Sequence, residues 1–191
     1  RRSDILEVVD NIPNIEDVGG LDAVKDFLQI YSGQFSEEAI AFGIEPLRGI
    51  ILTGVPGTGK SLVAKTIGSV WKLPVLRLDI GKVMAGIVGQ SEERMRQAIQ
   101  IAQATAPVVL WCDEIEKSLS GTGSSNVSDG GTISRVFGTL LTAMEESLKN
   151  VVVVATANDI SALPPELIRR FDEVFFVNLP TREERKEILD I

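Results

Sequence analysis

The stretch "GVPGTGKS" (54–61) follows the apolar run "RGIILT" (48–53) and leads into a helical pattern that starts at Lys60. It matches the spacing G-x-x-x-x-G-K-[ST] with a strand before it and a helix after it, which is the context this pattern requires. Its glycines let the backbone curl so that successive N–H groups face inward, and the helix start adds the positive end of its dipole. The alternative is a glycine-rich turn that binds nothing. We therefore predict a loop that holds nucleotide phosphates.

Apolar runs alternate with helical patterns along the whole chain. The predicted strands are 49–53, 74–79, 107–113, 151–156 and 173–178, and helices are expected to start near Lys60, Ser91 and Thr132. Strands that are apolar throughout are buried on both faces, which is typical of a parallel sheet covered by helices. Ligands of such α/β folds bind at the carboxyl ends of the strands.

The composition of the 191 residues suits one soluble domain and argues against several classes of protein. A net charge of −8 argues against a broad electrostatic contact with nucleic acid, which needs dense Lys and Arg. No apolar run approaches the ~20 residues of a membrane span, and the start of the chain lacks the apolar segment of a secretory signal. The single cysteine, Cys112, suits a reducing compartment, the cytoplasm or a stroma-like one. Because the chain has no histidine, proton transfer falls to a carboxylate, a lysine or water.

Two adjacent acids lie at the end of the third predicted strand, in "VVLWCDEIEKS" (108–118). Lys60 can reach the β- and γ-phosphates, and the Ser61 hydroxyl is a Mg²⁺ ligand in loops of this kind. Asp113 would approach the same metal, since Mg²⁺ takes one or two carboxylates and keeps most of its waters. Glu114 comes next and can orient and polarise an attacking water. The alternative is a solvated acidic loop at a helix start. The pair favours hydrolysis, because the second acid helps only if water is the nucleophile.

A third element is Asn158, at the end of the apolar run 151–156. Its amide could sense the γ-phosphate or hold the attacking water, although Asn at a strand end is also a common turn former. The segment lacks N-K-x-D, and Asp113 is not followed by x-x-Gly, so ATP is expected rather than GTP. The residues predicted to contact the nucleotide are Gly54, Val55, Pro56, Gly57, Thr58, Gly59, Lys60, Ser61 and Leu62.

With these motifs, the chain resembles the AAA family of AAA+ ATPases from Ile15 to Leu189. The matching stretches are "IEDVGGLDAVKDFL", "GIEPLRGIILTGVPGTGKS", "GIVGQSEERMR" and "VVVVATANDISALPPELIRRFDEVFFVNLPTREERKEIL". Among AAA proteins it is most similar to the hypothetical AAA proteins of cyanobacteria and algal plastids. The resemblance implies a three-layer P-loop NTPase core of the ASCE/AAA+ type at 15–191, after a flank or linker at 1–14. It implies a five-stranded parallel sheet of order 5-1-4-3-2, ATP and Mg²⁺ as cofactors, and adenine contacts by Asp17, Val18 and Gly19.

The chain departs from the family pattern at three places. The family's arginine finger lies in a segment like R-x-G-R-F-D, whereas Arg169 and Arg170 are adjacent here, so either could act in a neighbouring subunit's site. The alternative is a surface pair that caps a short helix after Pro165. The pore-loop segment 86–89 has aliphatic residues where the family often has an aromatic, which weakens a threading role and also fits a buried turn. The chain stops at Ile191, where the helical lid begins, so we expect the lid to be missing and hydrolysis by this piece to be weak.

Three functions fit these observations. The first is an ATPase motor in a ring, such as a hexamer, that remodels a protein or complex, with Arg135 as a candidate inter-subunit contact. The second is a slow, ATP-gated regulatory module without threading activity, which turnover and its dependence on protein concentration would distinguish. The third is a small-molecule P-loop kinase, which needs an Arg-rich lid that neither 118–131 nor the residues after 160 supply.

Overall fold

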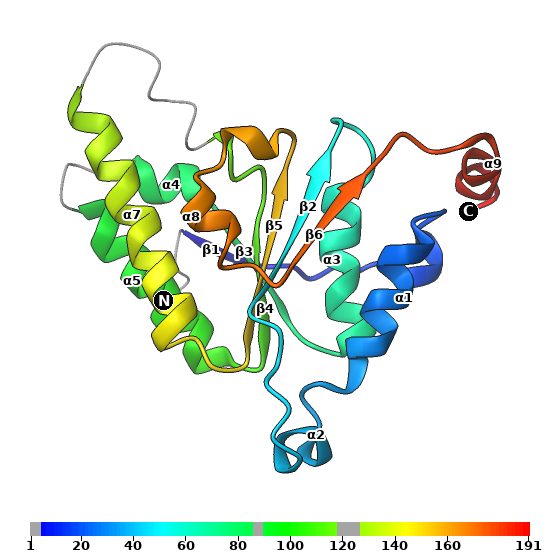
Figure 1. The fold of residues 1–191 in the computed structure, drawn as a ribbon, viewed down its shortest axis with the longest axis horizontal. Helices are drawn as coiled ribbons and strands as arrows, with labels where there is room; N and C mark the ends of the chain where they lie inside the picture. Colours follow the sequence, from blue (N-terminus) through cyan, green and yellow to red (C-terminus); the bar gives the residue numbers. More distant parts are fainter. Residues whose placement is uncertain (1–4, 86–89, 118–126) are drawn as a thin grey trace.

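A central sheet covered by helices on both faces forms the core of the computed structural model, which describes residues 5–85, 90–117 and 127–191 (Figure 1). The strands are β1 (Leu6–Val8), β2 (Gly49–Gly54), β3 (Val75–Leu78), β4 (Val108–Cys112), β5 (Val151–Ala157) and β6 (Glu173–Val177). The α-helices are α1 (Asp22–Ile30), α2 (Glu37–Ala41), α3 (Lys60–Trp71), α4 (Ile80–Met84), α5 (Gln90–Thr105), α7 (Val127–Glu146), α8 (Pro165–Ile168) and α9 (Arg182–Asp190). Short 3-10 turns are η1 (Ile15–Asp17), η2 (Tyr31–Gly33) and η4 (Ile160–Ala162).

The strand order across the sheet is β1-β3-β4-β5-β2-β6. Strands β2 to β6 are parallel and are the five predicted strands in the predicted order, which confirms that part of the fold. The sheet also has a sixth strand that we did not predict. Strand β1 lies within residues 1–14, which were expected to be a flank or linker, and pairs antiparallel with β3, with Glu7 opposite Arg77. The sheet is therefore mixed. The sequence did not predict β1 because a strand of three residues is too short to show a hydrophobic period.

Two hydrophobic layers lie on the two faces of the sheet. Successive side chains of a strand point to opposite faces, so Leu110 of β4 packs in the cluster that contains α4, α5, α7 and α8. The next residue, Trp111, packs in the cluster that contains α1 and α3. Strands β4 and β5 are buried along their whole length. These layers confirm the expected three-layer core, and Figure 1 shows α1 and α3 on one side of the sheet and α5 and α7 on the other.

The helices begin close to the predicted positions, with one exception. Helix α3 begins at Lys60 as predicted, and α5 begins one residue before Ser91. Helix α7 begins at Val127, five residues before the predicted start at Thr132. The segment "VSDGG" at its start contains poor helix formers, which is why the sequence predicted a loop there. Buried residues further along the same helix, such as Val136 and Leu140, anchor it to the core, and such packing outweighs local propensity.

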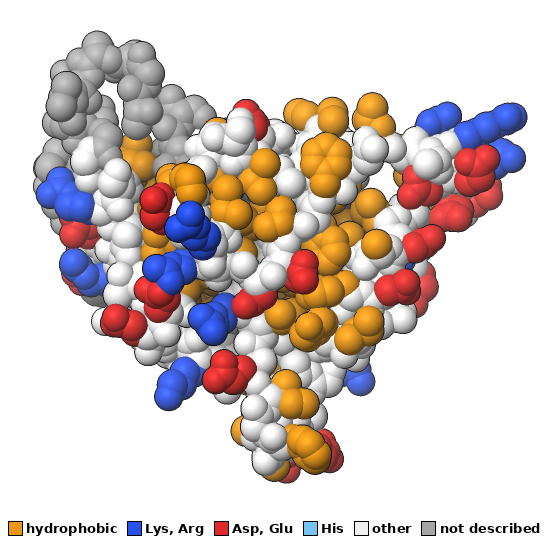
Figure 2. Space-filling view, viewed as in Figure 1, with side chains coloured by type: hydrophobic (Ala, Val, Ile, Leu, Met, Phe, Trp, Pro, Cys, Tyr) orange, Lys and Arg blue, Asp and Glu red, His pale blue; other side chains and the backbone are white. Residues whose placement is uncertain are grey.

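Strand β6 is one edge of the sheet, and it exposes two large apolar side chains. Val174 is 39% exposed and Phe176 is 67% exposed. Figure 2 shows hydrophobic side chains gathered over this part of the face, with charged side chains toward both sides. Within the described ranges, no helix has the length and apolarity needed to cross a membrane.

Candidate functional site

The predicted phosphate loop joins β2 to α3. Gly54, Gly57 and Gly59 have φ angles of 145°, 83° and 89°, which an L side chain rarely adopts. At Gly54, a Cβ would overlap the carbonyl oxygen of Val177 on the neighbouring strand β6. Residues 55–57 are exposed. The loop is therefore curled as the motif predicts, and a glycine at its first position is required for β6 to approach.

Lys60 lies beneath this loop and is 6% exposed. Its Nζ donates hydrogen bonds to the carbonyl oxygens of Gly54, at 2.7 Å, and Val55, at 2.8 Å. Burial lowers the pKa of Lys60, and the negative charges of Glu116, Glu114 and Asp113 oppose that effect. The ammonium group thus holds the loop closed and supplies a positive charge to an anion that enters it.

Asp113 joins the loop to the sheet. Its Oδ1 accepts hydrogen bonds from Ser61 Oγ at 2.9 Å and from Thr156 Oγ1 at 2.7 Å. A hydroxyl and a carboxylate are the hard oxygen ligands that Mg²⁺ prefers, so this donor set fits the ion. No group of three or more His, Cys, Asp or Glu side chains that could hold a metal is found in the described part of the chain.

Glu114 is held by contacts from three directions. Its backbone, with φ of 48°, donates N–H to Thr156 Oγ1 at 2.8 Å. Its Oε1 accepts from Asn158 Nδ2 at 3.4 Å, and its Oε2 pairs with Lys117 Nζ at 2.5 Å. The hydrogen bond from Lys117 is the main cause that lowers the pKa of Glu114. Glu114 is thus ionised at neutral pH, as a general base must be.

The polar residues that the sequence did not predict at this site include two that lie on strands of the sheet. Thr156 on β5 contacts both acids, and Arg77 Nη2 on β3 lies 3.3 Å from Asp113 Oδ2. Both lie within runs that were interpreted as apolar strands. The available signal was a polar side chain inside a buried strand, since such a group needs a hydrogen-bond partner.

A cavity of about 510 Å³ lies beside the phosphate loop, within the size range of small-molecule sites. It is lined by the predicted residues Asp17, Val18, Gly19, Gly57, Thr58, Gly59 and Leu62. Its other lining comes from the start of α1, from β6 and the segment after it, and from α9 and the residue that follows it. This lining includes Phe175, Phe176, Leu179, Ile188 and Ile191, which were not predicted. A Cβ on Gly19 would lie 2.6 Å from Ile188 Cγ1, so the glycine allows α9 to pack there. The residues expected near the adenine thus lie next to the phosphate loop.

The two candidate finger arginines differ in their surroundings. Arg170 Nη1 forms an ion pair with Glu145 on α7. The Arg169 side chain is exposed and forms no hydrogen bond or ion pair with any described residue. Neither arginine lines the cavity beside the loop of its own chain. Arg169 directly follows the short helix α8, as the capping alternative predicted.

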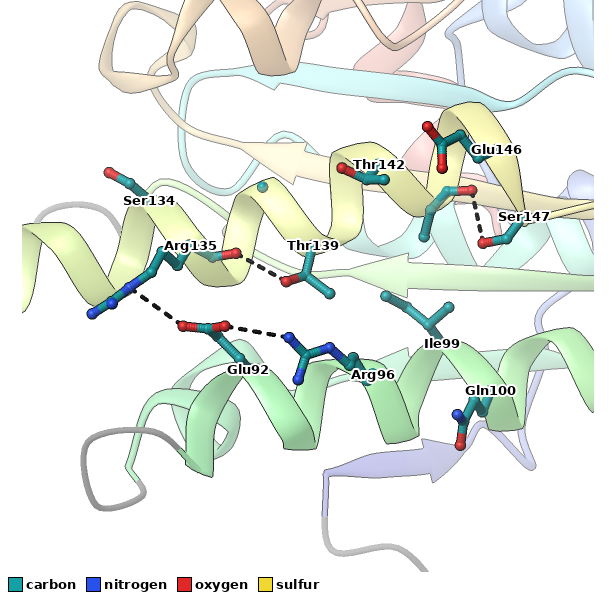
Figure 3. A pocket seen from close by; sticks show the side chains of 12 residues that line it. Glu92, Arg96, Ile99, Gln100, Ser134, Arg135, Thr139, Thr142, Glu146 and Ser147 are labelled. Carbon is teal, nitrogen blue, oxygen red and sulfur yellow. Dashed lines mark hydrogen bonds and ion pairs between the residues drawn. The ribbon is translucent and has the colours of Figure 1, made fainter.

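Arg135 lies in a groove of about 720 Å³ between α5 and α7. Its Nε lies 3.3 Å from Glu92 Oε1 and also donates to the carbonyl of Gly131. Arg96 binds the other oxygen of Glu92 at 3.4 Å, so both arginines point toward one acid, as Figure 3 shows. The predicted pore loop at 86–89 lies outside the described residues.

Comparisons with known proteins agree with this geometry. Residues 50–179 match the family described as "ATPase family associated with various cellular activities (AAA)". The chain is 46% identical over 192 residues to "Uncharacterized AAA domain-containing protein ycf46" of Guillardia theta, covering 100% of this chain and 38% of the relative. It is 32% identical to "ATPase family gene 2 protein homolog A" of Homo sapiens, covering 100% of this chain and 22% of that protein. The chain thus spans well under half the length of these relatives.

The fold is also similar to a solved structure. The crystal structure of the FIGL-1 AAA domain in complex with ADP superposes with a TM-score of 0.77 at 26% identity, covering 98% of this chain and 63% of that one. The matched family region includes the phosphate loop, both acids and Asn158. The resemblance stated from the sequence is therefore confirmed, and this chain belongs to the AAA family of ATPases.

Proposed function

We propose that this chain binds ATP with Mg²⁺ and hydrolyses it, and that a ring of copies couples hydrolysis to the remodelling of a protein or complex. The observation that carries the proposal is the 2.9 Å contact between Ser61 Oγ and Asp113 Oδ1. This contact joins the phosphate loop to the acids after β4, so the two halves of a hydrolytic site meet. The ADP in the similar FIGL-1 AAA domain supports a nucleotide as the ligand.

Most of the predicted site residues have a role in this proposal. The N–H groups of residues 54–59 and the Lys60 ammonium hold the phosphates, while Asp17, Val18 and Gly19 border the adenine. Ser61 and Asp113 hold Mg²⁺, which neutralises phosphate charge when it is bound. Glu114 accepts the proton of the attacking water, and Asn158 fixes the Glu114 carboxylate through their hydrogen bond.

AAA domains often form oligomers, and we propose that Arg169 rather than Arg170 acts in the neighbour's site. Arg170 forms an ion pair with Glu145 of its own chain, whereas the Arg169 side chain is exposed and has no ion-pair partner among the described residues. The apolar surface of β6 supports a face that another copy covers. Arg135 is a weaker candidate for such a contact, because Glu92 of the same chain already binds it.

The extent of the ATPase subdomain and its compartment are also part of the proposal. We propose residues 15–191 as the large αβα subdomain, with β1 added at the sheet edge. A reducing compartment, the cytoplasm or a plastid stroma, agrees with the buried, unpaired Cys112.

The alternative is a slow, ATP-gated regulatory module. The contact between Glu114 and Lys117 favours it, because a carboxylate that is paired with an ammonium is a weaker base toward water. Steady-state ATP turnover of the full-length protein separates the two functions. A motor whose sites are shared between subunits should show turnover that rises steeply with protein concentration. A regulator should stay slow at every concentration.

Glu114→Gln should leave nucleotide binding intact and stop turnover; normal turnover in this variant would place the base elsewhere. Mixing then tests the arginine. Equal amounts of Glu114→Gln and Arg169→Ala subunits should regain about a quarter of wild-type turnover, since half of the subunits keep the base and half of their neighbours keep the arginine. Arg170→Ala is the matched control: it should be active alone, and its equal mixture with Glu114→Gln should show only dilution to about half of wild-type turnover. Recovery with neither arginine would contradict a shared site.

A further inference from the structure

Arg77 is a cation beside the proposed metal-binding acid, and it has no role in the predicted motifs. Its Nη2 lies 3.3 Å from Asp113 Oδ2, and its Nη1 lies 3.9 Å from Glu7 Oε2 on β1. The guanidinium also lies over the indole ring of Trp111, 5.2 Å from its centroid. Arg77 and Trp111 are direct partners in the β3–β4 register. Stacking and register therefore place the guanidinium next to Asp113 before any ligand binds.

We propose that Arg77 competes with the divalent cation for Asp113 and thereby lowers the affinity of the site for Mg²⁺. The inference rests on the proposed role of Asp113 as a metal ligand. Arg77 neutralises the carboxylate while the metal is absent, and its charge remains close when the metal arrives. Arg77 is thus a positioning residue that sets how tightly the nucleotide site holds its metal.

Two effects of Arg77 on the metal have opposite signs. It helps to orient the Asp113 carboxylate, which favours metal binding, and it repels a cation, which opposes binding. Orientation does not depend on Arg77 alone, because the hydroxyls of Ser61 and Thr156 bind Oδ1 at 2.9 and 2.7 Å, both shorter than the arginine contact. Repulsion scales with the product of the charges and is doubled for a divalent ion. Loss of Arg77 should therefore tighten metal binding.

The size of the effect follows from the exposure of the guanidinium. The Arg77 side chain is 43% exposed, so water and salt screen its charge. Exposed charge pairs are worth far less than buried ones, and we expect a change of roughly fivefold in the metal dissociation constant.

The test uses the full-length protein saturated with ADP, and Mn²⁺ is titrated as the probe. Bound Mn²⁺ is measured by the loss of the electron paramagnetic resonance signal of the free ion. The variants are Arg77→Gln and Arg77→Met, which remove the charge, and Arg77→Lys, which keeps it. Arg77→Met retains a long apolar side chain over Trp111, so it answers the question if Arg77→Gln unfolds. Arg96→Gln is the matched control, because it removes the same charge from an exposed arginine on α5.

At about 50 mM salt, Arg77→Gln and Arg77→Met should bind Mn²⁺ roughly fivefold more tightly than wild type, and at about 0.5 M salt the difference should nearly vanish. Arg77→Lys and Arg96→Gln should stay close to wild type. Unchanged or weaker Mn²⁺ binding in both uncharged variants would overturn the inference. Asp113→Asn distinguishes a failure of this inference from a failure of the proposed function. If it loses Mn²⁺ while the Arg77 variants do not change, the proposed function stands without this inference, and if it binds Mn²⁺ normally, both fail.

Discussion

Replacing Thr156 with valine tests whether one hydroxyl holds both acids of the site. Thr156 is 1% exposed, and its Oγ1 donates to Asp113 Oδ1 at 2.7 Å while accepting the Glu114 N–H at 2.8 Å. Valine has nearly the same shape and lacks the hydroxyl. The substitution therefore removes two hydrogen bonds without creating a cavity.

The magnitude follows from those two contacts. A hydrogen bond to a charged group contributes about 1.5–3 kcal/mol, and a buried N–H left without a partner costs about 1–3 kcal/mol. The two losses share one hydroxyl and do not add fully, so we expect Thr156→Val to lower the free energy of unfolding by about 3 kcal/mol. Thr156→Ser keeps the hydroxyl and loses one methyl, which should cost about 1 kcal/mol.

Urea unfolding of the nucleotide-free protein, followed by tryptophan fluorescence, measures both variants. ATP turnover should also fall in Thr156→Val, by roughly tenfold to a hundredfold, because the backbone of Glu114 loses its anchor and the base is misplaced. Thr156→Ser should keep most of its turnover. Equal stability and equal turnover in the two variants would refute the idea that the hydroxyl organises the acids.

Three further outcomes are expected. Lys60→Ala should weaken ADP binding by at least about a hundredfold, since an ammonium–phosphate contact is lost in a buried site; calorimetry that still shows micromolar affinity would contradict the loop assignment. Gly54→Ala should lower the free energy of unfolding by about 2–4 kcal/mol, because its Cβ would overlap the carbonyl of Val177. Gly57→Ala, where the space is open, should cost only the backbone strain of about 1–2 kcal/mol, and equal thermal shifts in the two variants would count against the overlap. Burial raises the pKa of Cys112 to about 12, so the native protein should resist alkylation at pH 8, and mass spectrometry that finds rapid labelling would show that the site opens.

The main fold was predictable because its strands carry a strong signal. Runs such as 151–156 are apolar throughout, and burial on both faces is what a parallel strand between helices requires. Strand β1 and the start of α7 were missed for different reasons. The strand is too short for a pattern, and the helix start consists of residues that favour loops, while packing of Val136 and Leu140 further along stabilises the helix.

The glycine-rich loop and the pair of acids were each predictable because the residues within each motif are close in sequence. Their spacing therefore describes the local geometry of each motif. The lining of the cavity by α9 was not, since Gly19 and Ile188 meet only after the chain has crossed the whole sheet. The choice between Arg169 and Arg170 also needed the structure, because it depends on Glu145, an acid on a separate helix. Contacts between residues distant in sequence thus account for most of what the sequence left open.

The polar residues that bind the acids are predictable from the sequence only when the order of the strands is taken into account. Arg77 and Asp113 are 36 residues apart, and Thr156 lies 42 residues beyond Glu114, so no local motif contains them. The strand order β3-β4-β5 makes their strands neighbours. Residues two apart on a strand share a face, and Val75, Trp111 and Val154 all pack on the side of α3. Arg77, Asp113 and Thr156 each follow one of these by two positions. Strand order and the period of two together therefore place all three on the face of α3, beside Ser61. Polar side chains that converge at one place on a sheet are expected to hydrogen-bond to one another.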